Sequence, residues 1–176
     1  MLHKLYEFHS EHELLEVVDS NNKLLALMPK SSVLAKKLSY RSVILLLKEA
    51  NKKSLFKINQ DNLEVPYLFD LPVGQSSTSL AEKFETDFEI KANHLLKLAL
   101  LKPSSTRPYF AEIIGLVFQG QELTLKVVQD TNLILLDQVE FQGLRAQDFK
   151  LGPLLEACLN FEQVREFLNI KAKPNL

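Results

Sequence analysis

The chain has 176 residues, 46% of them hydrophobic and 24% charged, which is the composition of an ordinary globular protein with one sizeable core. Its 21 basic and 22 acidic residues give a formal net charge of -1, which excludes the strong basic field that attracts nucleic acid or anionic membranes. The single cysteine, Cys158, excludes an internal disulfide and indicates a reducing compartment.

The first half of the chain is predicted to be mainly β. Residues 13–28 have the pattern of a β-hairpin, with turn residues at 19–22. Residues 42–47 form a continuous apolar run, which predicts a central strand with both faces covered. Residues 54–58 are expected to pair back as a second hairpin, and the two prolines of residues 65–73 predict an irregular or edge strand.

The strongest helix signal lies in the middle of the chain. Ser79 is predicted to open this helix, because Glu82 three residues later completes a capping box. Leu80, Phe84 and Phe88 recur every four residues and define its buried stripe. The helix is therefore expected to pack on one face of the sheet.

The second half continues with strands and ends in helices. Strands are predicted at residues 95–101, 109–118, 123–128, 133–136 and 139–141. From residue 147 onward apolar residues recur with helical spacing, and Cys158 falls in that run as a buried thiol. One mid-chain helix packed on a sheet, with further helices at the C-terminus, is an α+β architecture.

The chain is predicted to be one domain with two short ends. We expect an N-terminal extension at residues 1–12, the domain at residues 13–170 and a frayed tail at residues 171–176. No apolar run has the length of a signal-peptide core or a transmembrane helix. We therefore expect a cytoplasmic protein with no membrane partner and no nucleic-acid partner.

Several short segments carry a family resemblance. Residues 15–23, 29–33 and 38–43 resemble, in order and spacing, the opening of Nudix hydrolases, in the branch related to isopentenyl-diphosphate isomerase. Tyr40-Arg41 stands where that branch has a His-Arg pair. Residues 69–74 look like the approach to the catalytic motif of the family.

The resemblance covers residues 13–168 and implies a fold and a chemistry. The implied fold is a Nudix-like α/β/α sandwich with a mixed β-sheet. The implied chemistry is hydrolysis of a diphosphate, in which glutamates on one helix hold Mg²⁺ or Mn²⁺ and the metal activates water. Dimers are common in this branch, so the resemblance also implies a homodimer.

The catalytic motif of the family is degenerate in this chain. Its core reads R-E-U-x-E-E-x-G-U, where U is a bulky aliphatic residue, and residues 82–90 occupy that place. Lys83 and Thr86 replace two of its glutamates, and Asp87 replaces the third with a shorter carboxylate. Glu89 replaces its glycine. The loop before the helix is also shorter than the motif requires, so the earlier glutamate of the family is missing.

The acidic residues of the helix are the candidate metal ligands, namely Glu82, Glu85, Asp87 and Glu89. On a helical wheel the three glutamates fall close enough together to share one metal, but on the side opposite the apolar stripe, whereas Asp87 falls near the stripe. A solvated acidic face is the competing interpretation. We therefore expect no cofactor, with Mg²⁺ or Mn²⁺ only if the chain is an enzyme.

Four residues are candidates for catalysis or binding. Asp87 keeps the last acidic position of the motif, and Glu112 interrupts an apolar strand where relatives can carry a catalytic base. Arg41 and Lys57 stand at positions that resemble those contacting diphosphates in relatives, so they are candidates for binding a small phosphorylated ligand. The competing interpretation, which the sequence favours for each of these two, is a solvated charge at a strand end.

Two functions remain open. The first is a Nudix-fold protein that has lost catalysis and acts as a ligand-binding or protein-interaction module. The second is a divergent Nudix hydrolase that cleaves a nucleoside diphosphate derivative with ligands gathered from elsewhere in the chain. Because most of the expected metal-binding carboxylates are missing, the sequence favours the first function.

Overall fold

The computed structural model describes residues 13–120 and 122–171, so the predicted N-terminal extension and most of the predicted tail lie outside the described residues. The strands are β1 (Leu14–Val18), β2 (Leu24–Pro29), β3 (Tyr40–Glu49), β4 (Ser54–Asn59), β5 (Asn62–Glu64), β6 (Tyr67–Asp70), β7 (His94–Leu101), β8 (Tyr109–Phe118), β9 (Leu133–Leu136) and β10 (Lys150–Leu151). The helices are α1 (Lys30–Ala35), α2 (Ser77–Asp87), α3 (Glu122–Gln129), α4 (Gln138–Ala146), α5 (Pro153–Cys158) and α6 (Glu162–Leu168). None of the helices in this part of the chain is long and apolar enough to cross a membrane.

Strand β3 is the centre of a mixed sheet, as its apolar run predicted. It pairs in parallel with β8 along its whole length, from Tyr40 opposite Tyr109 to Glu49 opposite Phe118. Strand β6 pairs antiparallel on its other side, and β7 pairs antiparallel with β8. The predicted β1–β2 hairpin is present and joins the start of β3 through Val17.

A smaller group of strands continues from the far end of β3. Strand β4 meets β3 only at Lys48 and Ser54 and then pairs with β9 on one side and β5 on the other. Strand β10 adds to β5 in parallel. The predicted pairing of residues 54–58 with β3 is therefore confined to one residue pair, because β6 occupies the edge of β3 between residues 42 and 45.

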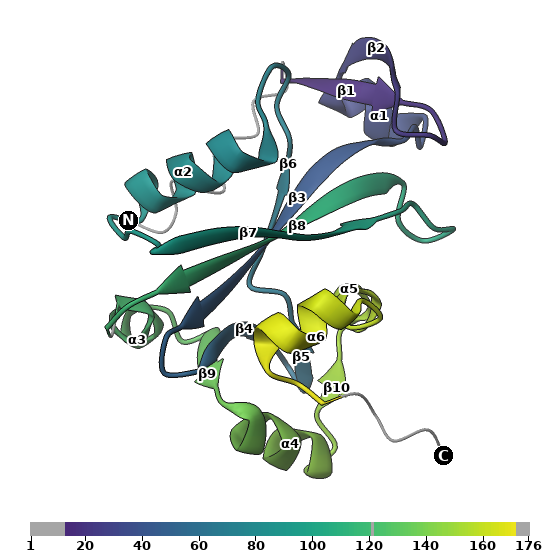
Figure 1. The fold of residues 1–176 in the computed structure, drawn as a ribbon. Coiled ribbons are helices and arrows are strands. Elements are labelled where there is room, and N and C mark those ends of the chain that lie inside the picture. The colour runs from purple at the N-terminus through teal and green to yellow at the C-terminus, as the bar shows by residue number, and fades with distance from the viewer. Residues whose placement is uncertain (1–12, 121, 172–176) are drawn as a thin grey trace.

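Helices cover both faces of the central sheet (Figure 1). Alternate residues of β3 separate into two cores, with Val43 and Leu45 on the side of α2 and Ile44 and Leu46 on the side of α5 and α6. This arrangement is the α/β/α sandwich that the resemblance implied. Cys158 lies fully buried on α5 in the second core, as predicted, and burial raises the pKa of its thiol to about 12.

Helix α2 begins earlier than its predicted capping box. Ser76 is the N-cap, and its Oγ accepts a hydrogen bond from the Ser79 N–H at 3.1 Å. The Ser79 Oγ accepts one from the Ser76 N–H at 3.0 Å, so a serine takes the place that the prediction gave to Glu82. The capping box formed by Ser76 and Ser79 therefore lies three residues, about one helical turn, before the predicted one. The stripe of Leu80, Phe84 and Phe88 is buried, as predicted.

Residues 123–128 were predicted as a strand, which is wrong, because they belong to helix α3. The carboxylate of Glu49, from the end of β3, accepts hydrogen bonds from the Thr124 N–H and the Thr124 Oγ, both at 3.0 Å. Leu123 and Val127 lie four residues apart and pack on the core beside α2. The β-branched residues suggested a strand, but a cap from a distant residue stabilises the helix.

The strand predicted at residues 139–141 is also wrong, because helix α4 spans that segment. Its N-cap is Asp137, whose Oδ1 accepts from the Glu140 N–H at 2.9 Å, while Glu140 Oε2 accepts from the Asp137 N–H at 2.9 Å. This capping box can be recognised in the sequence as the pattern Asp-x-x-Glu. It favours a helix more strongly than the β-propensity of Val139 favours a strand, because Val139 is exposed and its side chain has no sheet to pack on.

Candidate functional site

The carboxylates on α2 and directly after it do not gather at one point. Glu82, Asp87 and Glu89 are exposed, although the helical wheel placed Asp87 near the apolar stripe. Glu85 is partly buried, and its Oε1 accepts a hydrogen bond from the Ala92 N–H at 2.7 Å. The one sheltered carboxylate of the helix therefore stabilises the segment that leads from α2 to β7.

Directly after α2, Glu89 has a backbone conformation that glycine adopts more readily than other residues. Glu89 has a left-handed backbone, with φ of 54°. The Ile90 N–H donates to the Glu85 carbonyl at 3.0 Å and the Glu89 N–H to the Thr86 carbonyl at 3.2 Å, which is a Schellman motif. Glu89 is the residue that the resemblance aligns with the glycine of the Nudix motif, and buried Ile90 is the one that it aligns with the bulky aliphatic position after that glycine.

The residues of α2 do not fit a divalent metal. Mg²⁺ and Mn²⁺ require several oxygen ligands that converge on one point. One oxygen of Glu85 is already bonded to a backbone N–H, and the other candidate ligands project into solvent. Within residues 13–120 and 122–171, no group of three or more His, Cys, Asp or Glu residues is placed to hold a metal.

Glu112 lies at the opposite end of α2 from Asp87. Its Oε2 accepts a hydrogen bond from the Ser77 Oγ, in the first turn of α2, and lies 3.6 Å from the Lys97 Nζ on β7. Ser77 is buried and Lys97 is exposed. Since Ser77 and Asp87 are ten residues apart on the helix, about 15 Å separates the two ends. The structure therefore does not bring the two catalytic candidates together.

Arg41 is engaged within the protein. Its Nε donates to the Asn22 Oδ1 at 3.0 Å, one terminal nitrogen donates to the Asn22 carbonyl at 2.7 Å, and the other pairs with Glu16. These contacts fasten the turn of the β1–β2 hairpin to β3. All three nitrogens of the Arg41 guanidinium, the group predicted to contact a phosphate, therefore have protein partners.

Lys57 lies in a different part of the fold from Arg41. It is partly buried in the middle of β4, opposite Glu64 on β5 and Leu133 on β9. Near Arg41 the neighbour of β3 is β6 rather than β4, so the two cations do not face one ligand position. Whether either residue binds a ligand stays a prediction.

A polar cluster at the start of β3 was not anticipated as a unit. Asp70 at the end of β6 pairs with Lys30 of α1. Burial, and then the nearby Asp70 carboxylate, raises the pKa of Tyr40 above its usual range. The ring centroids of Tyr40 and Tyr109 are 5.6 Å apart, and burial also raises the pKa of Tyr109. The sequence signal for this cluster was limited to Asp70 and the Tyr40-Arg41 pair.

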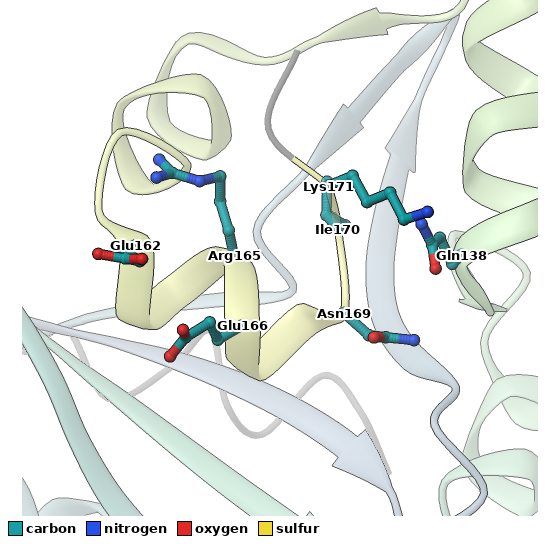
Figure 2. Close-up of a pocket in the computed structure, with 7 residues that line it drawn as sticks. All are labelled: Gln138, Glu162, Arg165, Glu166, Asn169, Ile170 and Lys171. Atoms are coloured by element: carbon teal, nitrogen blue, oxygen red, sulfur yellow. The ribbon is translucent and has the colours of Figure 1, made fainter. Parts of the chain in front are cut away.

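A surface pocket of about 320 Å³ lies between the start of α4 and α6. It is lined by Gln138, Glu162, Arg165, Glu166, Asn169, Ile170 and Lys171. Figure 2 shows Lys171 extending toward Gln138, whereas Glu162 and Arg165 point away from them. The Arg165 guanidinium donates to the Leu159 carbonyl at 2.7 Å. The charged groups of this pocket therefore do not converge on one ligand.

Comparison with known proteins gives similar solved structures, but neither a family model nor a curated protein matches the chain. The crystal structure of DR0079 from Deinococcus radiodurans is 14% identical, covers 88% of this chain and 98% of its own, and has a TM-score of 0.59. A mutT/nudix family protein from Listeria innocua is 16% identical, with coverages of 72% and 94% and a TM-score of 0.49. A solution structure of DR0079, described there as a hypothetical Nudix protein, is 14% identical, with coverages of 60% and 68% and a TM-score of 0.41. At these identities the likeness to the DR0079 crystal structure shows a shared fold.

Proposed function

We propose that this chain, which has a Nudix-like fold, is a ligand-binding or protein-interaction module and not a metal-dependent hydrolase. The observation that carries the proposal is the disposition of the carboxylates on α2. The Glu85 carboxylate accepts a hydrogen bond from the backbone N–H of Ala92, after the helix. The side chains of Glu82, Asp87 and Glu89 are exposed to solvent. Hydrolysis assisted by Mg²⁺ or Mn²⁺ needs ligands that hold the ion against the substrate, and this helix does not supply them.

The segment before α2 supports the same proposal. Gly74 has a left-handed backbone, with φ of 75°, and the helix already begins at Ser77. The Nudix motif places a longer loop and a glutamate between its first glycine and its helix. Here Gln75 stands in place of that glycine, and only the N-cap Ser76 separates it from the helix, so this segment is too short to carry the additional glutamate.

A divergent hydrolase is the second candidate, and Glu112 is the observation in its favour. Its carboxylate is partly exposed at the N-terminal end of α2, beside the cationic Lys97. A carboxylate there could act as a general base for a nucleoside diphosphate derivative. The hydrogen bond from Ser77 and the proximity of Lys97 give Glu112 a structural role that explains its position equally well.

The two candidates are separated by a turnover assay. Purified protein is incubated with a panel of nucleoside diphosphate derivatives in the presence of Mg²⁺ or Mn²⁺, and cleavage of the diphosphate linkage is followed by chromatography. We expect no cleavage above the protein-free background. Cleavage that is lost in Glu112→Gln would establish the hydrolase and overturn the binding module.

The proposal also includes a small phosphorylated ligand, a homodimer and a cytoplasmic location. Because Arg41 already has protein partners, Lys57 is the better remaining candidate for contact with a phosphate. Nucleotide titration followed by NMR, with Lys57→Gln as the variant, tests the ligand. Light scattering tests the dimer, and a strict monomer at all concentrations would exclude it.

A further inference from the structure

The β1–β2 hairpin and α1 form a lobe at the start of β3, which we call the hairpin lobe (residues 14–37; Figure 1). Its interior is a small core that includes Leu15, Val17 and Val33. Its surface carries exposed leucines at Leu14, Leu24, Leu25, Leu27 and Leu34. Leu25 is 64% exposed, and exposed apolar side chains are characteristic of interaction surfaces where they adjoin one another.

Strand β2 is the edge of the sheet on this side. It pairs with β1, and nothing within residues 13–120 and 122–171 pairs with its outer edge. Strand β7 is also an edge, but it carries Lys97 at its centre next to a β-bulge. A central charge and a bulge discourage association with other chains. Strand β2 also has a bulge at its start, but it contains no charged residue.

The exposed charges of the hairpin lobe all have the same sign. Lys23, Lys36 and Lys37 are exposed, and none of them has an ion-pair partner among the described residues. The acidic residues of the hairpin are engaged internally: Glu16 pairs with Arg41, and Asp19 accepts hydrogen bonds from backbone N–H groups of its own turn. The lobe therefore presents leucines together with lysines that have no ion-pair partner in the described part of the chain.

The hairpin lobe is fixed to the body of the protein by polar contacts. Arg41 binds Glu16 and Asn22 of the hairpin, and Lys30 of α1 pairs with Asp70 of β6. A β-bridge between Leu15 and Pro72 adds a backbone connection. Because these contacts hold the lobe in place before any partner arrives, docking on it would require little ordering of the protein itself.

We propose that the hairpin lobe docks an acidic, leucine-bearing peptide segment of a partner protein. The proposal rests on the proposed function and names a partner class for it. The leucines supply apolar contact area, and Lys23, Lys36 and Lys37 select a segment rich in carboxylates. Charge complementarity favours this partner over the lobe of a second copy, because two apposed lobes would bring their lysines together.

The probe for this docking is a fluorescein-labelled synthetic peptide in which glutamate and leucine alternate. Its fluorescence anisotropy is measured against the full chain at low and high salt. We expect saturable binding that weakens at high salt. The double variant Lys36→Glu/Lys37→Glu should bind at least about tenfold more weakly, and so should Leu25→Ser/Leu27→Ser. The matched control is Leu96→Ser/Leu100→Ser on β7, which should bind as the wild type does.

Several outcomes would overturn the docking proposal. They are no binding of the peptide, equal binding by the lobe variants, or equal binding of a peptide with lysine in place of glutamate. A dimer that is lost in Leu25→Ser/Leu27→Ser would assign the lobe to a second copy, and lobe-dependent sedimentation with phosphatidylserine vesicles would assign it to a membrane surface. Circular dichroism checks that each variant is folded. Failure of the proposed function is detected separately, by nucleotide turnover.

Discussion

The two faces of α2 differ in what they contribute. On the inner face the rings of Phe84 and Phe88 stack with centroids 4.2 Å apart, and Tyr67 meets them edge-on at 4.9 and 5.5 Å. On the outer face Glu82 and Asp87 extend into solvent. The packing that holds the helix on the sheet therefore does not involve these two carboxylates.

Removal of an inner-face ring should have the largest effect. Phe84→Ala deletes a buried ring and leaves a cavity between α2 and the sheet, so we expect the free energy of unfolding to fall by about 3–5 kcal/mol. Urea denaturation measures the change. A fall below about 1 kcal/mol would show that the inner face does not hold the helix.

Burial on the opposite side of the sheet should appear as a pH dependence. Burial raises the pKa of Cys158 from 9.0 to about 12, so between these values the unfolded chain has released the thiol proton and the folded chain retains it. The free energy of unfolding therefore falls as pH rises, by up to about 1.4 kcal/mol per pH unit for this one group. In the Cys158→Ala variant, urea denaturation at a series of pH values from 9 upward should show that the free energy of unfolding falls less steeply with pH than in the wild type. An unchanged dependence on pH would contradict the raised pKa of Cys158.

Among the acidic residues of α2, Glu85 should matter most for stability. Glu85→Ala removes the acceptor for the Ala92 N–H, and we expect a loss of about 1 kcal/mol. Glu82→Ala on the same helix is the matched control, because Glu82 is exposed, and it should stay within about 0.5 kcal/mol of the wild type. Equal losses in the two variants would remove the distinction between a structural and a solvated carboxylate.

Placing a glycine directly after α2, at position 89, should stabilise the protein. Glu89 has a left-handed backbone that glycine adopts without steric cost, so Glu89→Gly should raise the free energy of unfolding by about 0.5–1 kcal/mol. Asp87→Gly, at the last residue of α2, should lower it by less than about 1 kcal/mol. If both variants were destabilised, the glycine-like geometry at Glu89 would be in error.

The smallest effect is expected on the outer face. Glu82→Gln/Asp87→Asn changes two exposed carboxylates, and we expect thermal and urea denaturation to shift by no more than about 0.5 kcal/mol. A larger loss would show that these side chains have structural partners and would break the contrast between the two faces.

The local patterns that predicted correctly are those in which burial decides the structure. The apolar run of β3 and the stripe of Leu80, Phe84 and Phe88 each require a covered face, and the fold provides one. The errors at α3 and α4 came from weighing β-propensity above helix capping. The Asp137–Glu140 box could have been found in the sequence, whereas the cap that Glu49 gives α3 could not, because it joins residues 75 positions apart.

The site was harder to predict than the fold, because its residues owe their roles to tertiary contacts. The sequence placed Arg41 and Lys57 in related motif positions. In the structure the strand beside β3 near Arg41 is β6 and not β4, which carries Lys57, and Arg41 is hydrogen-bonded to the turn of the hairpin. Asp87 and Glu112 were candidates for the same chemistry, yet they lie near opposite ends of one helix. Motif spacing carries no information about these distances.

We propose that α2 packs on the sheet without forming a metal site, and the most direct test of this proposal is a calorimetric titration of the full chain with Mn²⁺. The disposition of Glu82, Glu85, Asp87 and Glu89 predicts no saturable binding and the same heats for the wild type and for Asp87→Ala. Saturable binding by the wild type that is lost in Asp87→Ala would contradict the proposal and would favour the metal-dependent hydrolase.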